Sequence, residues 1–233
     1  MQSVNVKSER IKMKIKVIGF ALVLCALVCF MAASCVADLS AHEYKVGDIG
    51  PAGGYIFYDC DADNASGNAD NLTSSTCGWR YLEVAPTDAG KYSFGYLRPD
   101  GATNTLTEVC ETSVGSGKAN TKALVRSMGN STYTSSTAST SKSVYAAISC
   151  DSYTVEVGRK VYDDWFLPSK DELNLLYDFL AEYGLLDQFK DYDYWTSSEQ
   201  YSNESWLQNF RTGAQSTYNK SDDNYVRAIR AFL

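Results

Sequence analysis

A predicted secretory signal is the feature that most constrains this chain. Residues 12–35 read KMKIKVIGFALVLCALVCFMAASC, a short basic stretch followed by an apolar run and small residues before Cys35. The apolar run at residues 17–33 is shorter than the ~20 residues that span a membrane comfortably. The sequence therefore predicts a signal peptide over residues 1–34, with Met13 as the start of translation and an exported domain behind it.

Cys35 is the expected attachment point of a lipid. The Ala-Ala-Ser that precedes it resembles a bacterial lipobox, in which the cysteine is acylated and becomes the mature N-terminus. The alternatives are an ordinary cleaved signal or an uncleaved anchor, with an unmodified cysteine. Val36 is not the aspartate associated with inner-membrane retention in some bacteria, which favours the outer membrane or cell surface of the envelope. We expect a tether over residues 35–45 and one domain over residues 46–233.

The charge of the expected mature chain argues against a nucleic-acid partner. Removing residues 1–34 takes away five of the 21 basic residues and one of the 28 acidic residues, which leaves 16 against 27 and a net charge of −11. A surface this acidic repels phosphate backbones. The expected partners are the membrane, through the lipid, and a protein or glycan ligand of unknown identity.

Four cysteines follow the lipobox, an even number for an exported chain. Two disulfide bonds are expected among them. Three connectivities are possible, and the sequential one closes the shortest loops. The spacing contains no C-x-x-C pair, so redox catalysis and a zinc knuckle are both disfavoured. The sequential pairs are Cys60 with Cys77 and Cys110 with Cys150.

Hydrophobic periodicity predicts an α+β domain with short strands and two principal helices. One helix is expected over residues 118–128. A clearer helix follows DDWFLP, where Ser169 and Glu172 form an S-x-x-E capping box and Gly184 ends the apolar face. Residues 129–143 are rich in Ser and Thr and are expected to form an exposed loop. The strand candidates are YIFYD, GWRYLEVAP, YDYWTSSE, SWLQNF and NYVRAIRAF.

An acidic stretch is the one candidate for a metal site. Alternating aspartates can direct several oxygens at one hard cation, as calcium loops do. The usual central glycine and final glutamate are missing, so the alternative is a solvated acidic loop. No cofactor is certain, and calcium is the single candidate. The residues concerned are Asp59, Asp61, Asp63 and Asp70.

Catalytic chemistry finds little support in the sequence. The single histidine, His42, lies in the expected tether, which disfavours a triad built on histidine. The remaining candidates for a hydrolase are the carboxylates around WFLPSK, of which Glu172 is already explained by the capping box. We therefore expect a protein that is not an enzyme. These carboxylates are Asp163, Asp164, Asp171 and Glu172.

The C-terminal segment has the composition of a binding surface. Across residues 194–225, four Tyr, six Ser and four Asn make up fourteen of thirty-two residues. Rigid Tyr combined with adaptable Ser and Asn is typical of binding surfaces, although an ordinary polar loop is the alternative. In SWLQNFR, alternation places Leu207, Asn209 and Arg211 on an outward face, opposite the face of Trp206. The predicted contacts are Tyr201, Asn203, Leu207, Asn209, Arg211, Gln215, Tyr218, Asn219, Asp222 and Asn224.

Seven segments together resemble one bacterial domain family. They are GDIGPAGGYIFYD, GWRYLEVAP, GSGKANT, DWFLPSKDELNLLYDF, YWTSSE, SWLQNFRTG and NYVRAIRAF. Across about residues 46–233 the chain resembles the Lcl C-terminal domain, found in a collagen-like adhesin and formerly a domain of unknown function. The ordered set LPSKDEL, YWTSSE, W-x-x-x-F-x-x-G and YVRAIRAF is its most specific part.

The resemblance implies a C-type-lectin-like fold, distantly similar to formylglycine-generating enzymes, with an exposed face built from the last loops and strands. In some related lipoproteins that segment is diversified by retroelements, and residues 201–224 have the expected composition. The E-P-N and W-N-D triplets of calcium-dependent sugar binding are missing, as is the catalytic cysteine pair of the enzymes, so fold does not imply either activity. The expected function is a lipid-anchored adhesin-like binding protein; the alternative is a structural envelope lipoprotein.

Overall fold

The computed structural model describes residues 43–65, 72–96, 109–129, 132–133, 141–190 and 192–233. Its contacts divide the chain into residues 1–43 and a compact unit Tyr44–Leu233, and the fold below is that of the second unit. The expected signal, Met13, Cys35, His42 and Asp70 lie outside the described residues. Among the described helices, none has the length and apolar character needed to cross a membrane.

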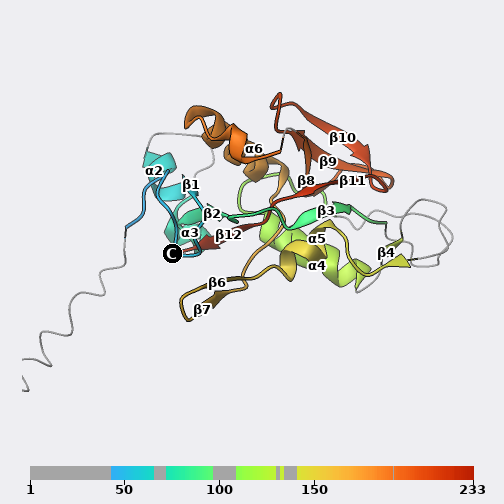
Figure 1. The fold of residues 1–233 in the computed structure, drawn as a ribbon, viewed down its shortest axis with the longest axis horizontal. Helices are drawn as coiled ribbons and strands as arrows, with labels where there is room; N and C mark the ends of the chain where they lie inside the picture. Colours follow the sequence, from blue (N-terminus) through green and yellow to red (C-terminus); the bar gives the residue numbers. More distant parts are fainter. Residues whose placement is uncertain (1–42, 66–71, 97–108, 130–131, 134–140, 191) are drawn as a thin grey trace, which may run out of the picture. The chain divides into compact units, whose positions relative to one another are not determined.

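Two sheets form the framework of this unit (Figure 1). The three-stranded sheet has the antiparallel order β1 (Ile56–Asp59), β2 (Tyr81–Val84) and β12 (Ile229–Phe232). The five-stranded sheet has the order β10 (Gln215–Asn219), β9 (Glu204–Asn209), β8 (Asp193–Glu199), β11 (Asp223–Val226) and β3 (Gly90–Ser93). Its β8–β11 pairing is parallel and the others are antiparallel. The first and last strands of the unit thus meet in one sheet.

The remaining elements are helices and two short hairpins. The helices are α2 (Cys60–Ala65), α3 (Ser74–Cys77), α4 (Gly117–Met128), α5 (Ala146–Asp151), α6 (Lys170–Glu182) and the 3-10 turn η1 (Leu186–Gln188). The hairpins pair β4 (Thr132–Tyr133) with β5 (Ser141–Lys142), and β6 (Val155–Val157) with β7 (Lys160–Tyr162). In Figure 1, α6 lies to the left of β9 and β10, while α4 and α5 lie below the five-stranded sheet.

Both faces of the five-stranded sheet are buried against helices. Alternation along β8 directs Tyr194 and Trp195 to opposite faces, and both side chains are fully buried. Trp195 packs with Leu124 of α4 in one apolar cluster, and Tyr194 packs with Leu176 of α6 in a second. Because strands covered on both faces lack a solvated side, their pattern differs from simple apolar and polar alternation.

The long helix α6 begins and ends where local sequence signals place it. The Ser169 hydroxyl accepts a hydrogen bond from the Glu172 amide at 3.3 Å, and the Glu172 carboxylate accepts one from the Ser169 amide at 2.7 Å. This reciprocal pair satisfies two amides that a helix start leaves open. Gly184, at φ +66°, follows the last turn. The predicted capping box is confirmed.

A glycine-rich turn before β1 holds a buried carboxylate. The amides of Ala52 and Gly54 donate to Glu83 at 2.9 and 3.0 Å. A Cβ on Gly54 would lie 1.7 Å from the carbonyl oxygen of Val84, so the backbone can approach β2 this closely only with glycine. The cluster GPAGG therefore has a structural role in positioning Glu83.

The structure confirms the α+β class and the two principal helices, and it changes two details. NYVRAIRAF forms two strands, β11 and β12, which belong to different sheets. Between them the Arg227 side chain donates to Asp88 at 2.7 Å and to the Ala85 carbonyl oxygen at 2.8 Å. Residues 215–219, expected as part of a polar segment, form the edge strand β10 because their backbone pairs with β9.

Candidate functional site

The predicted binding residues lie along the hairpin of β9 and β10, at the edge of the five-stranded sheet. Gln215 pairs with Gln208 near the turn, and Asn219 pairs with Glu204 at the opposite end. Six residues at roughly 3.4 Å each make β9 about 17–20 Å long. The structure therefore separates the predicted contacts into a tip group, near the β9–β10 turn, and a base group, near the other end of both strands.

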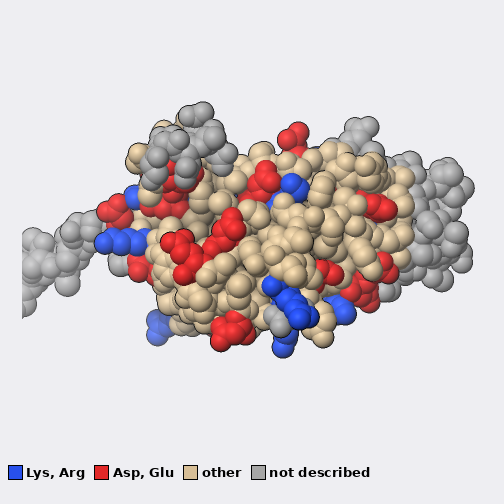
Figure 2. Space-filling view, turned by 90° about the horizontal axis from the view of Figure 1, so that it is seen from above, with Lys and Arg blue, Asp and Glu red and all other residues tan. Residues whose placement is uncertain are grey.

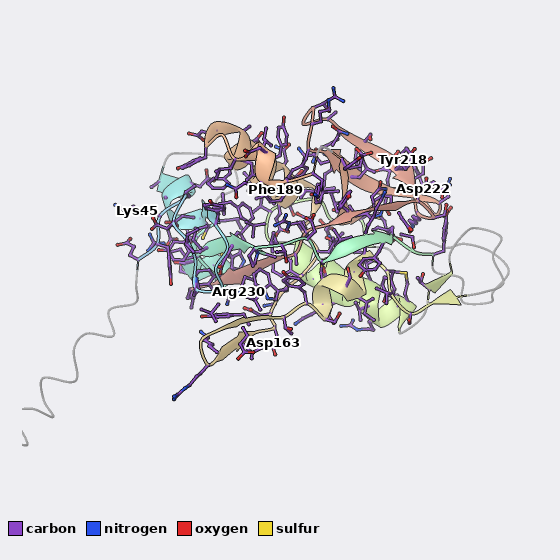
Figure 3. All side chains as sticks on the ribbon, in the orientation of Figure 1. Lys45, Asp163, Phe189, Tyr218, Asp222 and Arg230 are labelled. Atoms are coloured by element: carbon purple, nitrogen blue, oxygen red, sulfur yellow. The ribbon has the colours of Figure 1, made fainter. Side chains whose placement is uncertain are left out.

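The base group contains the most exposed of these side chains. Tyr201 and Tyr218 are 54% and 49% exposed, large fractions for aromatic residues. Asn203 and Asp222 are also exposed. The Asn219 amide oxygen accepts hydrogen bonds from Tyr96 and from both the amide and hydroxyl of Ser221. We define the base group as Tyr201, Asn203, Tyr218, Asn219 and Asp222; Figure 3 shows Tyr218 and Asp222 at the same end of the molecule.

Two side chains of the tip group form hydrogen bonds that hold the hairpin in place. The Asn209 side-chain oxygen accepts hydrogen bonds from the amides of Arg211 and Thr212 at 3.1 and 3.0 Å, which closes the turn. The Gln215 side chain donates to the Lys170 carbonyl oxygen at 2.8 Å. Arg211 is exposed. We define the tip group as Asn209, Arg211 and Gln215, of which only Arg211 is exposed.

Leu207 does not face outward, so that prediction is wrong. Its side chain is 2% exposed and packs in the cluster that contains Trp195, its partner across the β8–β9 ladder. The opposite face of β9 is covered too, because Gln208 is fully buried and donates to Asn174 of α6 at 2.9 Å. Strand alternation predicted two faces but could not reveal that helices cover both.

Asn224 lies apart from both groups. It sits on β11 opposite Tyr92 of β3, two strands away from β9, and it is half-buried. Its side-chain nitrogen is buried and makes no hydrogen bond with the described residues. Asn224 is therefore not part of the base group.

A buried ion pair beneath the base group was not predicted. The Lys220 ammonium, fully buried, lies 2.6 Å from the Glu199 carboxylate and donates to the Ser202 carbonyl oxygen at 3.3 Å. The Lys220 amide also donates to the Asn203 carbonyl oxygen. Burial lowers the pKa of Lys220, although Glu199 opposes this effect. A lysine within a polar run gave no sequence signal, because charged residues in such runs are usually solvated.

An aromatic cluster on the same sheet was missed as well. Tyr192 is 57% exposed and stacks on Tyr225 with ring centroids 5.4 Å apart. The Lys91 ammonium lies 5.9 and 5.6 Å from these two ring centroids. Seen from above in Figure 2, the surface around β8, β9 and β10 is mostly uncharged, with a few acidic side chains.

The acidic stretch does not form the expected loop over its described part. Residues 60–65 form α2, and Asp59 caps this helix and pairs with Arg80 at 3.0 Å. Asp61 accepts two hydrogen bonds from Ser74, each of 2.7 Å. Asp63 accepts one from Tyr58 at 3.0 Å. Asp59 and Asp61 also share Arg80, whose Nε lies 3.6 Å from the Asp61 carboxylate, and the described residues contain no cluster of metal ligands.

Two of the four carboxylates around WFLPSK, Asp164 and Glu172, have structural partners. Asp164 accepts two hydrogen bonds from Arg230, at 2.7 and 2.9 Å, and although burial opposes it, this contact lowers the pKa of Asp164. Burial raises the pKa of Glu172 to about 7 against the hydrogen bonds that its capping role provides. Figure 3 shows Asp163 on the far side of the molecule from Tyr218. Asp171 is a half-buried residue of the first turn of α6.

The structure contains no disulfide bond among the four described cysteines. The sulfur atoms of Cys60 and Cys77 lie 3.9 Å apart, as neighbouring thiols. Burial, followed by the neighbouring thiol, raises the pKa of Cys60 to about 12. Cys150 is fully buried in the apolar cluster around α5, whereas Cys110 is exposed. Neither predicted disulfide, Cys60–Cys77 or Cys110–Cys150, is formed in this structure.

The comparison with protein families now identifies the C-terminal part of the chain. The family model described as the Lcl C-terminal domain matches residues 150–230. The match covers 81 of the 233 residues, so the similarity to this domain family holds for the C-terminal third of the chain. The match confirms the resemblance over this range, which includes both groups of the β9–β10 hairpin. No curated protein matches the chain.

Proposed function

We propose that this protein is a lipid-anchored, non-enzymatic binding protein of the bacterial cell envelope, displayed at the outer membrane or cell surface. Its base group, on the Lcl C-terminal domain, contacts a protein or glycan ligand. The domain name suggests an adhesin-like surface family. A Cys35→Ser variant that still incorporates a labelled fatty acid would contradict the anchor.

One observation carries the proposal: two exposed tyrosines stand on a rigid, buried support. Tyr201 and Tyr218 are about half exposed, whereas Lys220 and Glu199 are almost fully buried. An exposed aromatic ring on a fixed backbone loses little conformational entropy on binding, and tyrosines commonly dominate interface energetics. Asn203 and Asp222 would add directional hydrogen bonds.

The fold supports the same reading at the level of architecture. We infer a C-type-lectin-like fold, since β1 and β12 join the two ends of the domain in one sheet and the last strands form an exposed edge. This likeness implies neither sugar binding nor calcium dependence. An experimental structure that does not superpose on C-type lectins would contradict it.

The decisive experiment compares the two ends of the hairpin. The full chain is tested on arrays of glycans and extracellular matrix proteins, with calcium and with a chelator. Replacement of both Tyr201 and Tyr218 by alanine should weaken binding to a specific partner at least about tenfold, as loss of hot-spot residues does. The matched control replaces Arg211 and Thr212, exposed residues at the tip, and should change the affinity less than about threefold.

The outcomes separate the proposal from its alternative. Equal losses in both variants, or a loss only at the tip, would move the binding surface away from the base group. A folded protein that binds no array component would favour the structural envelope lipoprotein. Loss of binding in chelator would return calcium to consideration, through residues other than the described aspartates.

A further inference from the structure

A cavity of about 300 Å³ lies between α3, α4, the start of α6 and β12. None of the residues that line it belongs to the β9–β10 hairpin. In Figure 1, α3 and β12 lie at the left of the domain and α4 at the lower centre. Most of its lining comes from outside residues 150–230, so the family match does not describe it. Its volume is at the lower end of the range for ligand pockets and suits a body the size of one aromatic ring.

One wall of the cavity is apolar and fixed in place. Phe166 is 2% exposed, and its backbone pairs with Ile229. The half-buried Trp79 packs against Tyr58 with ring centroids 6.2 Å apart. Ala231 completes this wall. A flat apolar ligand can therefore enter between Trp79 and Phe166 without rearranging the core.

Two lysines border the same cavity. Lys118 and Lys122 are one turn apart on α4, so their side chains emerge from one face of the helix. Within the described part of the chain, no carboxylate oxygen lies within 4.0 Å of either ammonium nitrogen. An anionic ligand would gain two charge-assisted contacts here without displacing an existing ion pair.

The carboxylates of Glu172 and Asp164 near the cavity form hydrogen bonds with partners other than the two lysines. Glu172 also lines the cavity, but its oxygens accept hydrogen bonds from the amides of Ser169 and Gly115 at 2.7 and 2.9 Å. An adjoining cavity of about 270 Å³ shares both lysines and is bordered by Asp151, Asp163 and Asp164. Of these, Asp164 accepts hydrogen bonds from Nε and Nη2 of Arg230. Burial opposes its charge, but Arg230 and, to a smaller extent, the charge of Lys118 lower the pKa of Asp164.

We propose that the cavity between α3, α4 and β12 binds a small carboxylate with an apolar body, a class that includes aromatic and short aliphatic acids. The carboxylate contacts Lys118 and Lys122, and the apolar body lies between Trp79 and Phe166. The positive pair is the complement of such an anion in a chain whose total charge is −7. This site is separate from the base group and does not depend on the proposed adhesin function.

Isothermal titration of the full chain with phenylacetate tests the site. The charge-reversed probe is 2-phenylethylamine, which has the same ring and an ammonium group. Phenylacetate should bind at least about tenfold more tightly, with a Kd below about 1 mM. Replacing Lys118 and Lys122 together by glutamine should weaken phenylacetate binding at least about tenfold.

A matched control uses another basic residue of the same helix. Arg126 lies in the last turn of α4, is exposed and does not line the cavity, so Arg126→Gln should change the Kd less than about twofold. Trp79→Leu should weaken the binding of both phenylacetate and 2-phenylethylamine, because it removes the aromatic ring from the wall of the cavity. Lysine variants are surface substitutions and should keep the unfolding midpoint of the parent.

Three results would overturn the proposal. The first is no heat of binding for phenylacetate at about 10 mM, well above the expected Kd. The second is equal or tighter binding of 2-phenylethylamine, which would assign the cavity to amines. The third is an unchanged phenylacetate affinity in the lysine double variant. Loss of array binding by the base-group variant bears on none of these results.

Discussion

Two basic residues near the C-terminus, Arg230 and Lys220, are both buried, but the protein stabilises their charges by different means. Arg230 donates to Asp164 at 2.7 and 2.9 Å and to Glu83 at 3.0 Å. Lys220 has a single carboxylate partner, Glu199, at 2.6 Å. The planar guanidinium can bridge two carboxylates at once, whereas an ammonium acts as a point charge.

The pKa directions of the two side chains reflect this difference. Burial opposes both charges and is the largest effect on each. At Arg230, hydrogen bonds and charges from Asp164 and Glu83 together outweigh burial and raise the pKa. At Lys220, Glu199 does not compensate for burial, and the pKa is lowered. Arg230 has two carboxylate partners and is 5% exposed, whereas Lys220 has one and is fully buried, so partners and burial together account for the opposite directions of the two pKa values.

Arg230 and Lys220 lie ten residues apart in the sequence but belong to different parts of the domain, the three-stranded sheet and the turn beside the base group. Arg230 closes the three-stranded sheet, since Glu83 lies on β2 directly opposite it. Lys220 lies in the turn between β10 and β11, two residues after the exposed Tyr218, and donates to the Ser202 carbonyl oxygen. The first cation therefore holds the two ends of the domain together, and the second positions the proposed binding surface.

Arg230→Ala should have the largest effect of the changes considered. It leaves Glu83 and Asp164 without their shared cation, and breaking a buried pair in this way typically costs about 3–5 kcal/mol. Arg230→Lys should recover only part of this loss because an ammonium cannot span both carboxylates. Urea denaturation followed by circular dichroism measures the change. Full recovery by lysine would show that the bidentate geometry is unimportant.

Lys220→Met should have a smaller effect, about 2–3 kcal/mol, because the methionine fills most of the space while the buried Glu199 loses the cation that balances its charge. Adding Glu199→Met should restore stability to within about 1 kcal/mol of the parent, since an apolar pair of similar volume removes the buried charge. Urea denaturation of the four members of this double-mutant cycle provides the coupling energy. If the double variant were as unstable as Lys220→Met alone, the loss of stability would not come from the buried charge of Glu199.

Arg211→Ala should have the smallest effect, a change of less than about 0.5 kcal/mol in the free energy of unfolding. Arg211 is exposed, and its described hydrogen bond uses the backbone amide, which alanine retains. The same urea denaturation measures this baseline. A loss above 1 kcal/mol, on the order of a buried hydrogen bond, would mean that the tip of the hairpin belongs to the framework.

Local signals predicted the elements whose chemistry is local. The capping box at Ser169 and Glu172 placed the start of α6 because both partners lie within one turn. The apolar periodicity over residues 118–128 placed α4 to within one residue. The segments YDYWTSSE and SWLQNF contain β8 and β9. The predicted capping residue Glu172 and the exposed Tyr201 and Tyr218 also lie where sequence reasoning places them.

Errors arose where distant residues decide the outcome. Leu207 was assigned to the surface because alternation gives two faces without saying what covers them, and here α4 and α6 lie on opposite sides of the sheet. The alternation of aspartates predicts one shared ion, yet Arg80 and Ser74, more than ten residues away in the chain, donate hydrogen bonds to Asp59 and Asp61. Residue spacing does not encode such competition between partners.

The sequence by itself determined the boundaries of α4 and α6, the α+β class, the resemblance to the Lcl C-terminal domain over residues 150–230 and the polar composition of the last strands. Tertiary structure decided the rest. It buried Leu207, divided the predicted contacts between the base and tip groups, and placed Lys220 opposite Glu199. It also brought Lys118 and Lys122 to the cavity beside Trp79. The physical reason is that capping and periodicity act within a few residues, whereas burial and charge pairing depend on segments brought together only by folding.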